Sequence, residues 1–235
     1  MKALLAIVFG AAALVLFAAG GARGQSETDG RALYAQSCSS CHGQDLRGVP
    51  GRGPNLRGVG EAAADFYIRT GRMPLRDPDD QPVRTESPFT PEQQAALTAY
   101  VGSFGGPGIP SVDPARGDLA TGRRLFGEHC MGCHQVVGEG GITTTGVVPD
   151  LQSASAVDVA EAVKVGPYVM PVFPQLTDAD VDSLARYVEY TKDPEDIGGW
   201  GIGHIGPIPE GMVAWLLAGV ALLLVIRIIG ERTTE

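Results

Sequence analysis

Two stretches of this chain, Cys38-Ser39-Ser40-Cys41-His42 and Cys130-Met131-Gly132-Cys133-His134, repeat the pattern Cys-x-x-Cys-His. The pattern suits covalent haem attachment, because two thiols can add to the two vinyl groups of one porphyrin edge while the adjacent imidazole reaches the iron. The chain has 4 Cys, so the two motifs use all of them. A zinc site would not need the following His, and a thioredoxin-like redox pair belongs to a βαβ context that this chain lacks. The sequence therefore predicts two covalently bound haem c groups, with His42 and His134 as iron ligands.

The composition agrees with small domains built around a prosthetic group. Aromatic residues make up only 6% of the 235 residues, while there are 33 Gly and 17 Pro. Small loop-rich domains bury little surface of their own, and a covalently bound haem adds both apolar area and a cross-link. The formal net charge of -9 argues against a nucleic-acid partner.

The residues before each motif repeat as well. Gly30 and Gly122 lie eight residues before the first Cys of their motifs, and Tyr34 and Phe126 lie four residues before it. Each segment therefore predicts one helix that runs into its haem motif. A repeat of this length indicates two similar domains that arose by duplication.

A second pair of helices is predicted to begin at Thr90 and Thr177. Each Thr can cap a first turn that contains acidic residues, and Pro91 stands at the first helical position of the earlier helix. Positions +7 and +10 from each Thr carry the same residue types and share a helix face; they are Leu97 with Tyr100, and Leu184 with Tyr187. We predict a first domain over 25–104, a Gly/Pro linker over 105–114 and a second domain over 115–196.

Each half also offers a sixth iron ligand, Met73 in the first and Met170 in the second. Both precede a Pro in a loop, 31 residues after His42 (73−42) and 36 residues after His134 (170−134). A thioether is a soft ligand that raises the reduction potential of haem iron. The alternative is that each Met only fills a gap in a core, which is its usual role.

Both ends of the chain carry apolar runs. A short positive start, an apolar middle and small residues predict a secretory signal over 1–24, or else an uncleaved anchor. The 18 residues of 212–229 would span about 27 Å, which is close to the bilayer core of about 30 Å. Arg227 and Arg232 lie at its end, so the positive-inside rule places the tail 230–235 in the cytoplasm and the haem domains outside it. A buried core helix is the alternative for 212–229.

Both halves resemble class I cytochromes c. In that family a Pro carbonyl in a Gly-Pro-Asn-Leu stretch accepts a hydrogen bond from the ring of the iron-binding His. The first half has Gly53-Pro54-Asn55-Leu56, and the second has the partial match Val148-Pro149-Asp150-Leu151. The resemblance implies that Pro54 and Pro149 orient the two imidazoles. It also implies an all-α fold with two tandem class I cytochrome c domains, followed by one transmembrane helix.

The whole chain resembles a narrower family, the cytochrome c subunit of actinobacterial menaquinol–cytochrome c reductase, a bc-type respiratory complex. The order of signal, two domains and anchor carries this resemblance, together with the Gly-rich connector 197–211 that contains Gly198-Gly199-Trp200-Gly201-Ile202-Gly203-His204-Ile205-Gly206-Pro207. It implies a cell-membrane protein with cytochrome b and Rieske iron–sulfur partners. The protein would relay single electrons from the Rieske subunit to a terminal cytochrome c oxidase, as the electron-transfer subunit of the reductase.

Other functions remain open at this point. A dihaem peroxidase needs an open iron position, which paired Met ligands argue against. A haem-based sensor needs an output domain. The dihaem subunit of another membrane complex, such as an oxidase or an alcohol dehydrogenase, is a closer alternative.

The two halves differ in charge. Residues 25–104 carry a net charge of −2 (8 Lys+Arg, 10 Asp+Glu) and residues 111–196 a net charge of −8 (6 Lys+Arg, 14 Asp+Glu). The acidic second half could dock a basic partner or simply be solvated.

The sequence assigns no role to the polar loop from Leu75 to Ser87.

Overall fold

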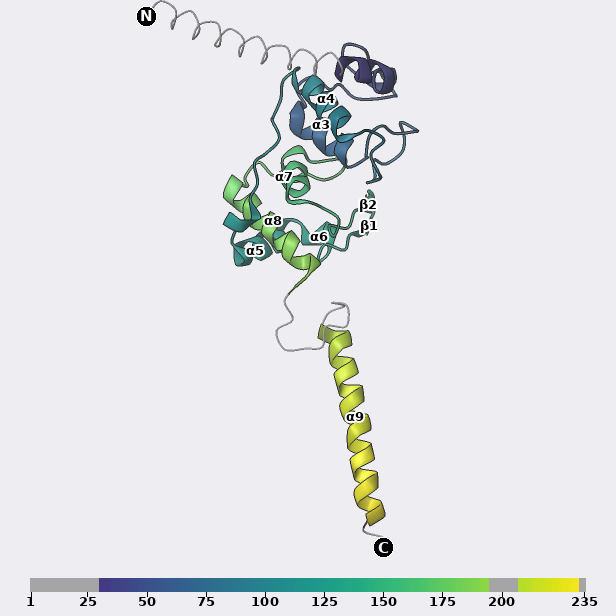
Figure 1. Ribbon diagram of the computed structural model, residues 1–235, viewed down its shortest axis with the longest axis vertical. Coiled ribbons are helices and arrows are strands. Elements are labelled where there is room, and N and C mark those ends of the chain that lie inside the picture. The colour runs from purple at the N-terminus through teal and green to yellow at the C-terminus, as the bar shows by residue number, and fades with distance from the viewer. Residues whose placement is uncertain (1–29, 195–206, 233–235) are drawn as a thin grey trace, which may run out of the picture. The chain divides into compact units, whose positions relative to one another are not determined.

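A computed structural model describes residues 30–194 and 207–232 of the chain (Figure 1). The predicted signal segment 1–24 and most of the Gly-rich connector, including Trp200 and His204, lie outside these residues. The described residues up to Thr191 form one compact unit, and those from Lys192 onward form a second. Residues 30–37 are helical. The elements that follow are α2 (Ser39–His42), α3 (Gly60–Arg69), α4 (Pro91–Gly102), η1 (Pro114–Arg116), α5 (Leu119–His129), α6 (Met131–His134), β1 (Gly141–Thr143), β2 (Gly146–Val148), α7 (Ala156–Val165), α8 (Asp178–Lys192) and α9 (Pro207–Arg232).

The repeated glycines mark the place where two helices cross in each half. A Cβ atom on Gly30 would lie 2.1 Å from the carbonyl oxygen of Ala96 in α4, and one on Gly122 would lie 2.0 Å from that of Ser183 in α8. No side chain fits at such a distance, so only glycine lets the two backbones touch. The same crossing therefore forms in both halves, as the repeat predicts.

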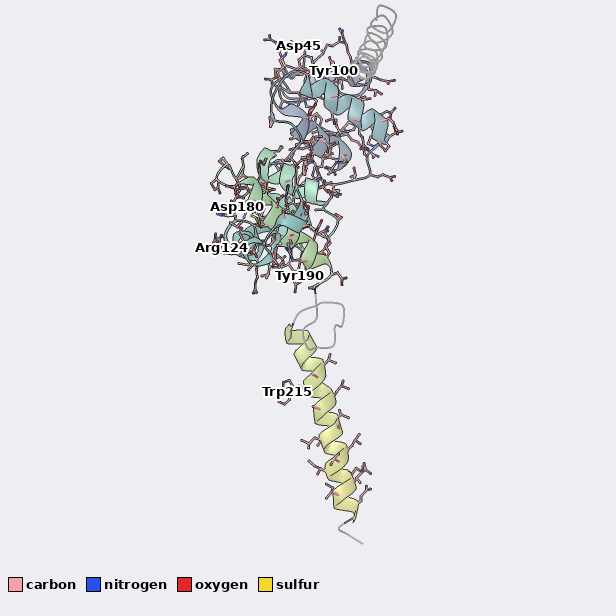
Figure 2. All side chains as sticks on the ribbon, turned by 60° about the vertical axis from the view of Figure 1, so that its left-hand side comes forward. Asp45, Tyr100, Arg124, Asp180, Tyr190 and Trp215 are labelled. Atoms are coloured by element: carbon pink, nitrogen blue, oxygen red, sulfur yellow. The ribbon has the colours of Figure 1, made fainter. Side chains whose placement is uncertain are left out.

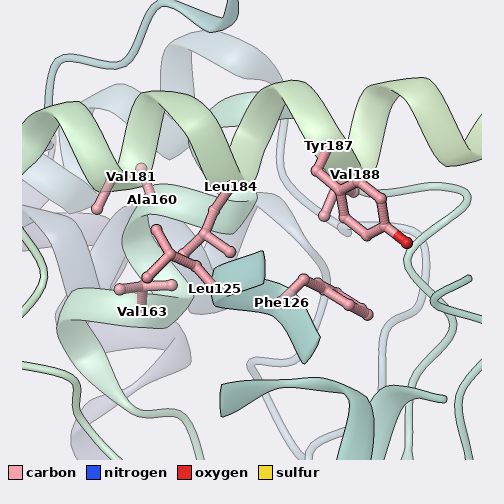
Figure 3. Packing of buried hydrophobic residues seen from close by; sticks show 8 residues of the cluster. All are labelled: Leu125, Phe126, Ala160, Val163, Val181, Leu184, Tyr187 and Val188. Atoms are coloured by element: carbon pink, nitrogen blue, oxygen red, sulfur yellow. The ribbon is translucent and has the colours of Figure 1, made fainter. Parts of the chain in front are cut away.

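Paired aromatic rings fill the space beside each crossing. The ring centroids of Tyr34 and Tyr100 lie 5.3 Å apart, and those of Phe126 and Tyr187 lie 5.1 Å apart. Both pairs are inclined at 51°, an orientation that aromatic rings favour over a face-to-face sandwich. The predicted shared face of the later helices is confirmed, because its residues are buried. In the second half the buried cluster is Leu125, Phe126, Ala160, Val163, Val181, Leu184, Tyr187 and Val188 (Figure 3).

The predicted helix starts are confirmed. Thr90 forms a capping box with Gln93 at the start of α4, where Pro91 is the first helical residue. Thr177 precedes α8, and its hydroxyl accepts a hydrogen bond of 3.2 Å from the amide of Asp180. Such caps satisfy amides that have no partner within the helix.

One element departs from the all-α prediction. Strands β1 and β2 pair antiparallel in the second half, with Ile142 opposite Val147. The segment contains Thr143 and Val148, whose β-branched side chains suit extended backbone. Its three-residue strands are too short to show the alternation that predicts a strand from sequence.

Helices α3 and α7, from different halves, pack against each other (Figure 1). Arg69 in α3 donates to Asp158 at 2.6 Å and to Glu161 at 2.7 Å, both in α7. Arg84 donates to the second oxygen of Asp158 at 2.5 Å. Part of the acidic excess of the second half is thus used inside the protein, against arginines of the first half.

The polar loop from Leu75 to Ser87 also spans the two halves. The Gln81 side chain accepts from the amide of Val147 at 2.9 Å and donates to its carbonyl at 2.6 Å. Arg84, described above, belongs to the same loop. The residues that distinguish the first half from the second therefore contact the second half.

Helix α9 contains one apolar stretch, Gly211–Glu231, that is long enough to cross a membrane. Its 21 residues would span about 32 Å. The helix extends beyond the predicted 212–229 at both ends. Trp215 projects from it with 80% of its surface exposed (Figure 2). Near the other end of the helix, the Nε atom of Arg227 donates a hydrogen bond of 2.9 Å to the Glu231 carboxylate.

Candidate haem sites

The first Cys-x-x-Cys-His motif lies around the short helix α2 and opens on a cavity of about 470 Å³. Cys38, Cys41 and His42 line this cavity, and Met73 lines it as well. The Nδ1 atom of His42 lies 2.9 Å from the carbonyl oxygen of Pro54. This hydrogen bond places the proton on Nδ1 and leaves the Nε2 lone pair for a metal.

The second motif repeats this arrangement around α6. A cavity of about 570 Å³ is lined by Cys130, Cys133, His134 and Met170. The Nδ1 atom of His134 lies 3.1 Å from the carbonyl oxygen of Pro149. The structure thus brings the imidazole, the two thiols and the thioether of each half to one cavity, although the Met follows the His by more than thirty residues in the sequence.

A glycine six residues after each His holds the Pro-containing loop in place. The amide of Gly48 donates to the carbonyl of His42 at 2.8 Å, and that of Gly140 donates to the carbonyl of His134 at 3.1 Å. Both have positive φ values, +84° and +72°, and a Cβ atom on either would lie within 2.7 Å of the opposite loop. The sequence prediction did not include these glycines. Their common spacing from the two His residues is the signal that could have found them.

Burial shifts the pKa of one thiol in each motif and of one imidazole. It raises the pKa of the Cys38 and Cys130 thiols to about 11 in each case, with the neighbouring Cys adding to the effect. Burial also lowers the pKa of His134, against the opposing hydrogen bond to Pro149. A neutral imidazole can serve as a metal ligand.

The second cavity includes side chains from the first half. Phe66 in α3, Arg72, and the loop residues 81–84 line it together with the second motif. Among the residues that the structure describes, those lining the first cavity all lie between Ser37 and Asp79. Sequence spacing could not have assigned Arg72 to the second site, because it directly precedes Met73 of the first.

The two cavities fit a haem in chemistry and in size. Each offers two thiols, one imidazole whose Nε2 is free, and one thioether, within the range of roughly 300–1,000 Å³ that small-molecule sites occupy. Arg72 lines the second cavity, and its buried Nη1 atom has no hydrogen-bond partner among the described residues. This cation would suit a carboxylate of the porphyrin.

Known families match both halves. The family described as "Cytochrome c" matches residues 27–104, and "Cytochrome C oxidase, cbb3-type, subunit III" matches residues 117–188. With the apolar helix that follows, the fold defines a protein of two tandem cytochrome c domains, a haem c-binding fold, with one candidate membrane anchor.

The cytochrome bc1 complex cytochrome c subunit of Corynebacterium diphtheriae is 34% identical over 87% of this chain and 80% of its own length. That of Mycobacterium tuberculosis is 38% identical over 87% of this chain and 77% of its own. The chain belongs to this family of cytochrome c subunits. Among solved structures, reduced cytochrome c4 from Pseudomonas stutzeri aligns with 68% of this chain and 95% of its own, at 22% identity and a TM-score of 0.27.

Proposed function

We propose that each domain holds one haem c through thioether bonds, to Cys38 and Cys41 in the first domain and to Cys130 and Cys133 in the second. The observation that carries the proposal is the repeated cavity, in which both thiols, the imidazole and the thioether converge. Bound haem would supply a one-electron Fe(III)/Fe(II) couple at each site.

The axial ligands would be His42 with Met73 in the first domain, and His134 with Met170 in the second. Pro54 and Pro149 orient the imidazoles through their carbonyl oxygens. The paired His and Met leave no open position for a substrate, so the chain's own chemistry is electron transfer.

The chain would serve as the electron-transfer subunit of a menaquinol–cytochrome c reductase, in which quinol chemistry belongs to other subunits. Family membership supports this assignment, because the relatives are subunits of cytochrome bc1 complexes and the similarity covers most of both chains. The partners would be cytochrome b and the Rieske iron–sulfur protein. The protein would accept single electrons from the Rieske protein and deliver them to a terminal cytochrome c oxidase.

Helix α9 would anchor the protein in the cell membrane, with the C-terminus in the cytoplasm and the cytochrome domains outside. The apolar stretch Gly211–Glu231 supports the anchor. Arg227 and Arg232 at its C-terminal end support the orientation. Cysteine accessibility labelling in spheroplasts tests it. A Cys introduced at Thr234 should react only after the membrane is permeabilised, and reaction in intact spheroplasts would reverse the orientation.

Haem stoichiometry tests the covalent sites. The pyridine haemochrome of the full chain should give two haems c per polypeptide, and replacing either Cys pair by Ser should leave one. Ser39→Ala is the matched control, because it lies inside the first motif but supplies neither a thiol nor an imidazole. Two haems in both Cys-pair variants would refute the attachment sites.

The visible spectrum of the protein, purified from its own membrane in mild detergent, tests the complex. Co-purifying b-type haem would support the reductase assignment, and a-type haem would indicate a bound oxidase. If the sample contains c-type haem alone, the reductase assignment is wrong and the chain is a free carrier or part of a different complex.

A further inference from the structure

Arg72 is a buried cation with one guanidinium nitrogen that lacks a hydrogen-bond partner among the described residues. Its residue is 8% exposed, and its Nη1 atom has no hydrogen-bond partner among the described residues. The guanidinium carbon lies 4.7 Å from the centroid of the Phe66 ring. That contact holds the plane of the guanidinium but does not satisfy its N–H groups. A buried guanidinium nitrogen left in this way is costly unless an acceptor arrives.

The cavity of the second domain is where such an acceptor can bind. Arg72 and Arg84 both line it, although both belong to the first domain. Arg84 already donates to Asp158 at 2.5 Å and to the Ser153 carbonyl at 3.4 Å. Among the described lining residues, Arg72 is therefore the arginine that still has a guanidinium nitrogen without a hydrogen-bond partner.

The chemistry of haem supplies the missing acceptor. A porphyrin of this type carries its two propionate carboxylates on the edge opposite the vinyl groups. Cys130 and Cys133 fix the vinyl edge, so the carboxylates belong to the far side of the cavity. A carboxylate matches the planar donor fork of a guanidinium in both geometry and charge.

We propose that the guanidinium group of Arg72 in the first domain donates to a propionate of the haem held by the second domain. The inference rests on the proposed function, since it requires haem at the second site. It has two consequences. The contact would tie the two domains together through the cofactor. The positive charge would favour the reduced haem, which carries one positive charge less, and so would raise the potential of the second site.

Three variants of the full-length protein test the contact. Arg72→Met removes the charge and keeps an unbranched apolar stem, whereas Arg72→Lys keeps the charge and loses the fork. Arg76→Met is the matched control, because Arg76 is exposed and lines neither cavity. The readouts are the two midpoint potentials, from a spectroelectrochemical titration, and the propionate bending modes in resonance Raman spectra. A fourth variant, Met170→His, is expected to lower the potential of the second haem and so identifies that component.

At the midpoint potential of the wild-type second haem, the oxidised-to-reduced ratio of that haem should be about tenfold higher in Arg72→Met. This corresponds to a midpoint potential that is lower by about 59 mV for a one-electron couple. The first component should stay unchanged, and Arg76→Met should match the wild type. Arg72→Lys should keep most of the potential but shift the propionate mode.

Unchanged potentials in an Arg72→Met protein with two haems would overturn the proposal, and so would a shift confined to the first haem. If Arg72→Met does not accumulate in cells, the resonance Raman spectrum of Arg72→Lys provides the test. A propionate mode at the wild-type frequency in Arg72→Lys would also refute the proposed contact. A wild-type protein that lacks haem at the second motif would instead refute the proposed function itself.

Discussion

Asp158 is the acidic centre of the contact between the two domains, and Asp158→Asn tests how much that contact contributes to stability. Its two oxygens accept from Arg69 at 2.6 Å and from Arg84 at 2.5 Å, and the residue is 4% exposed. It also caps α7 by accepting from the amide of Ser155 at 2.8 Å. Asparagine has nearly the same shape, but it removes the charge and replaces one of the two acceptor oxygens by an amide nitrogen that cannot accept.

The size of the effect follows from these contacts. A hydrogen bond to a charged group contributes about 1.5–3 kcal/mol, and the variant weakens two of them. The Arg69 and Arg84 side chains are 31% and 32% exposed, so water compensates in part. In the variant, Arg69 still has Asp65 and Glu161 as ion-pair partners. We expect a loss of about 2 kcal/mol, or roughly 4–8 °C in Tm for a chain of this size.

Thermal unfolding of the detergent-solubilised protein, followed by far-UV circular dichroism, measures this loss. Burial alone would raise the pKa of Asp158, but the Ser155 amide and the two arginines outweigh it and hold the pKa below the ordinary 3.8. The unfolded state therefore takes up the proton first as the pH falls. The difference in Tm between the wild type and Asp158→Asn should be largest at neutral pH and should shrink below about pH 3.8.

Asp178→Asn is the matched control. Asp178 is exposed and pairs with Lys164 within the second domain, so its loss should leave the Tm unchanged. A wild-type Tm in Asp158→Asn at neutral pH, or a deficit that persists undiminished at acid pH, would refute the reasoning.

Three further predictions concern the second domain. Gly122→Ala should lower the free energy of unfolding by about 2 kcal/mol or more, because the new Cβ would lie 2.0 Å from the Ser183 carbonyl oxygen. Gly127→Ala in the same helix meets open space and should raise it by about 0.5–1 kcal/mol. Chemical denaturation measures both. Burial raises the pKa of Glu161 to about 8 from 4.5, so wild-type stability should fall as the pH rises between these values. Glu161→Gln should remove that slope. Met170→His should lower the midpoint potential of one haem and leave the other unchanged.

Each of these has a clear contrary result. Equal stabilities of the two glycine variants would mean that the helix crossing tolerates a side chain. A pH slope that survives in Glu161→Gln would assign the titration to another group. Identical potentials in Met170→His and wild type would remove Met170 from the iron.

The repeated parts of the fold could be predicted from sequence because their requirements are local. A thiol, a thiol and an imidazole must stand at fixed spacing to hold one haem, and Gly30 and Gly122 must be small where helices touch. The capping of α4 by Thr90 depends on residues within one turn. The hairpin β1–β2 was missed because its three-residue strands carry no readable alternation.

The contacts between the halves could not be predicted in this way. Arg69 meets Asp158 across 89 residues, and Gln81 meets Val147 across 66. Charged and polar residues of this kind look like solvated surface in a sequence, since they have no period and no motif. The same holds for Arg72, whose neighbour Met73 ties it by sequence to the first site although its side chain lines the second.

The sequence by itself predicted the chemistry proposed for this protein, namely two haem motifs and their candidate Met ligands, and it predicted the duplicated domain and an apolar helix long enough to cross a membrane. These follow from covalent reactivity, ligand type and hydrophobic length, which a chain carries residue by residue. Only the tertiary structure decided which arginines join the two domains and which side chain of the first domain enters the cavity of the second. Those contacts depend on burial and on distances between remote residues, which exist only once the chain has folded.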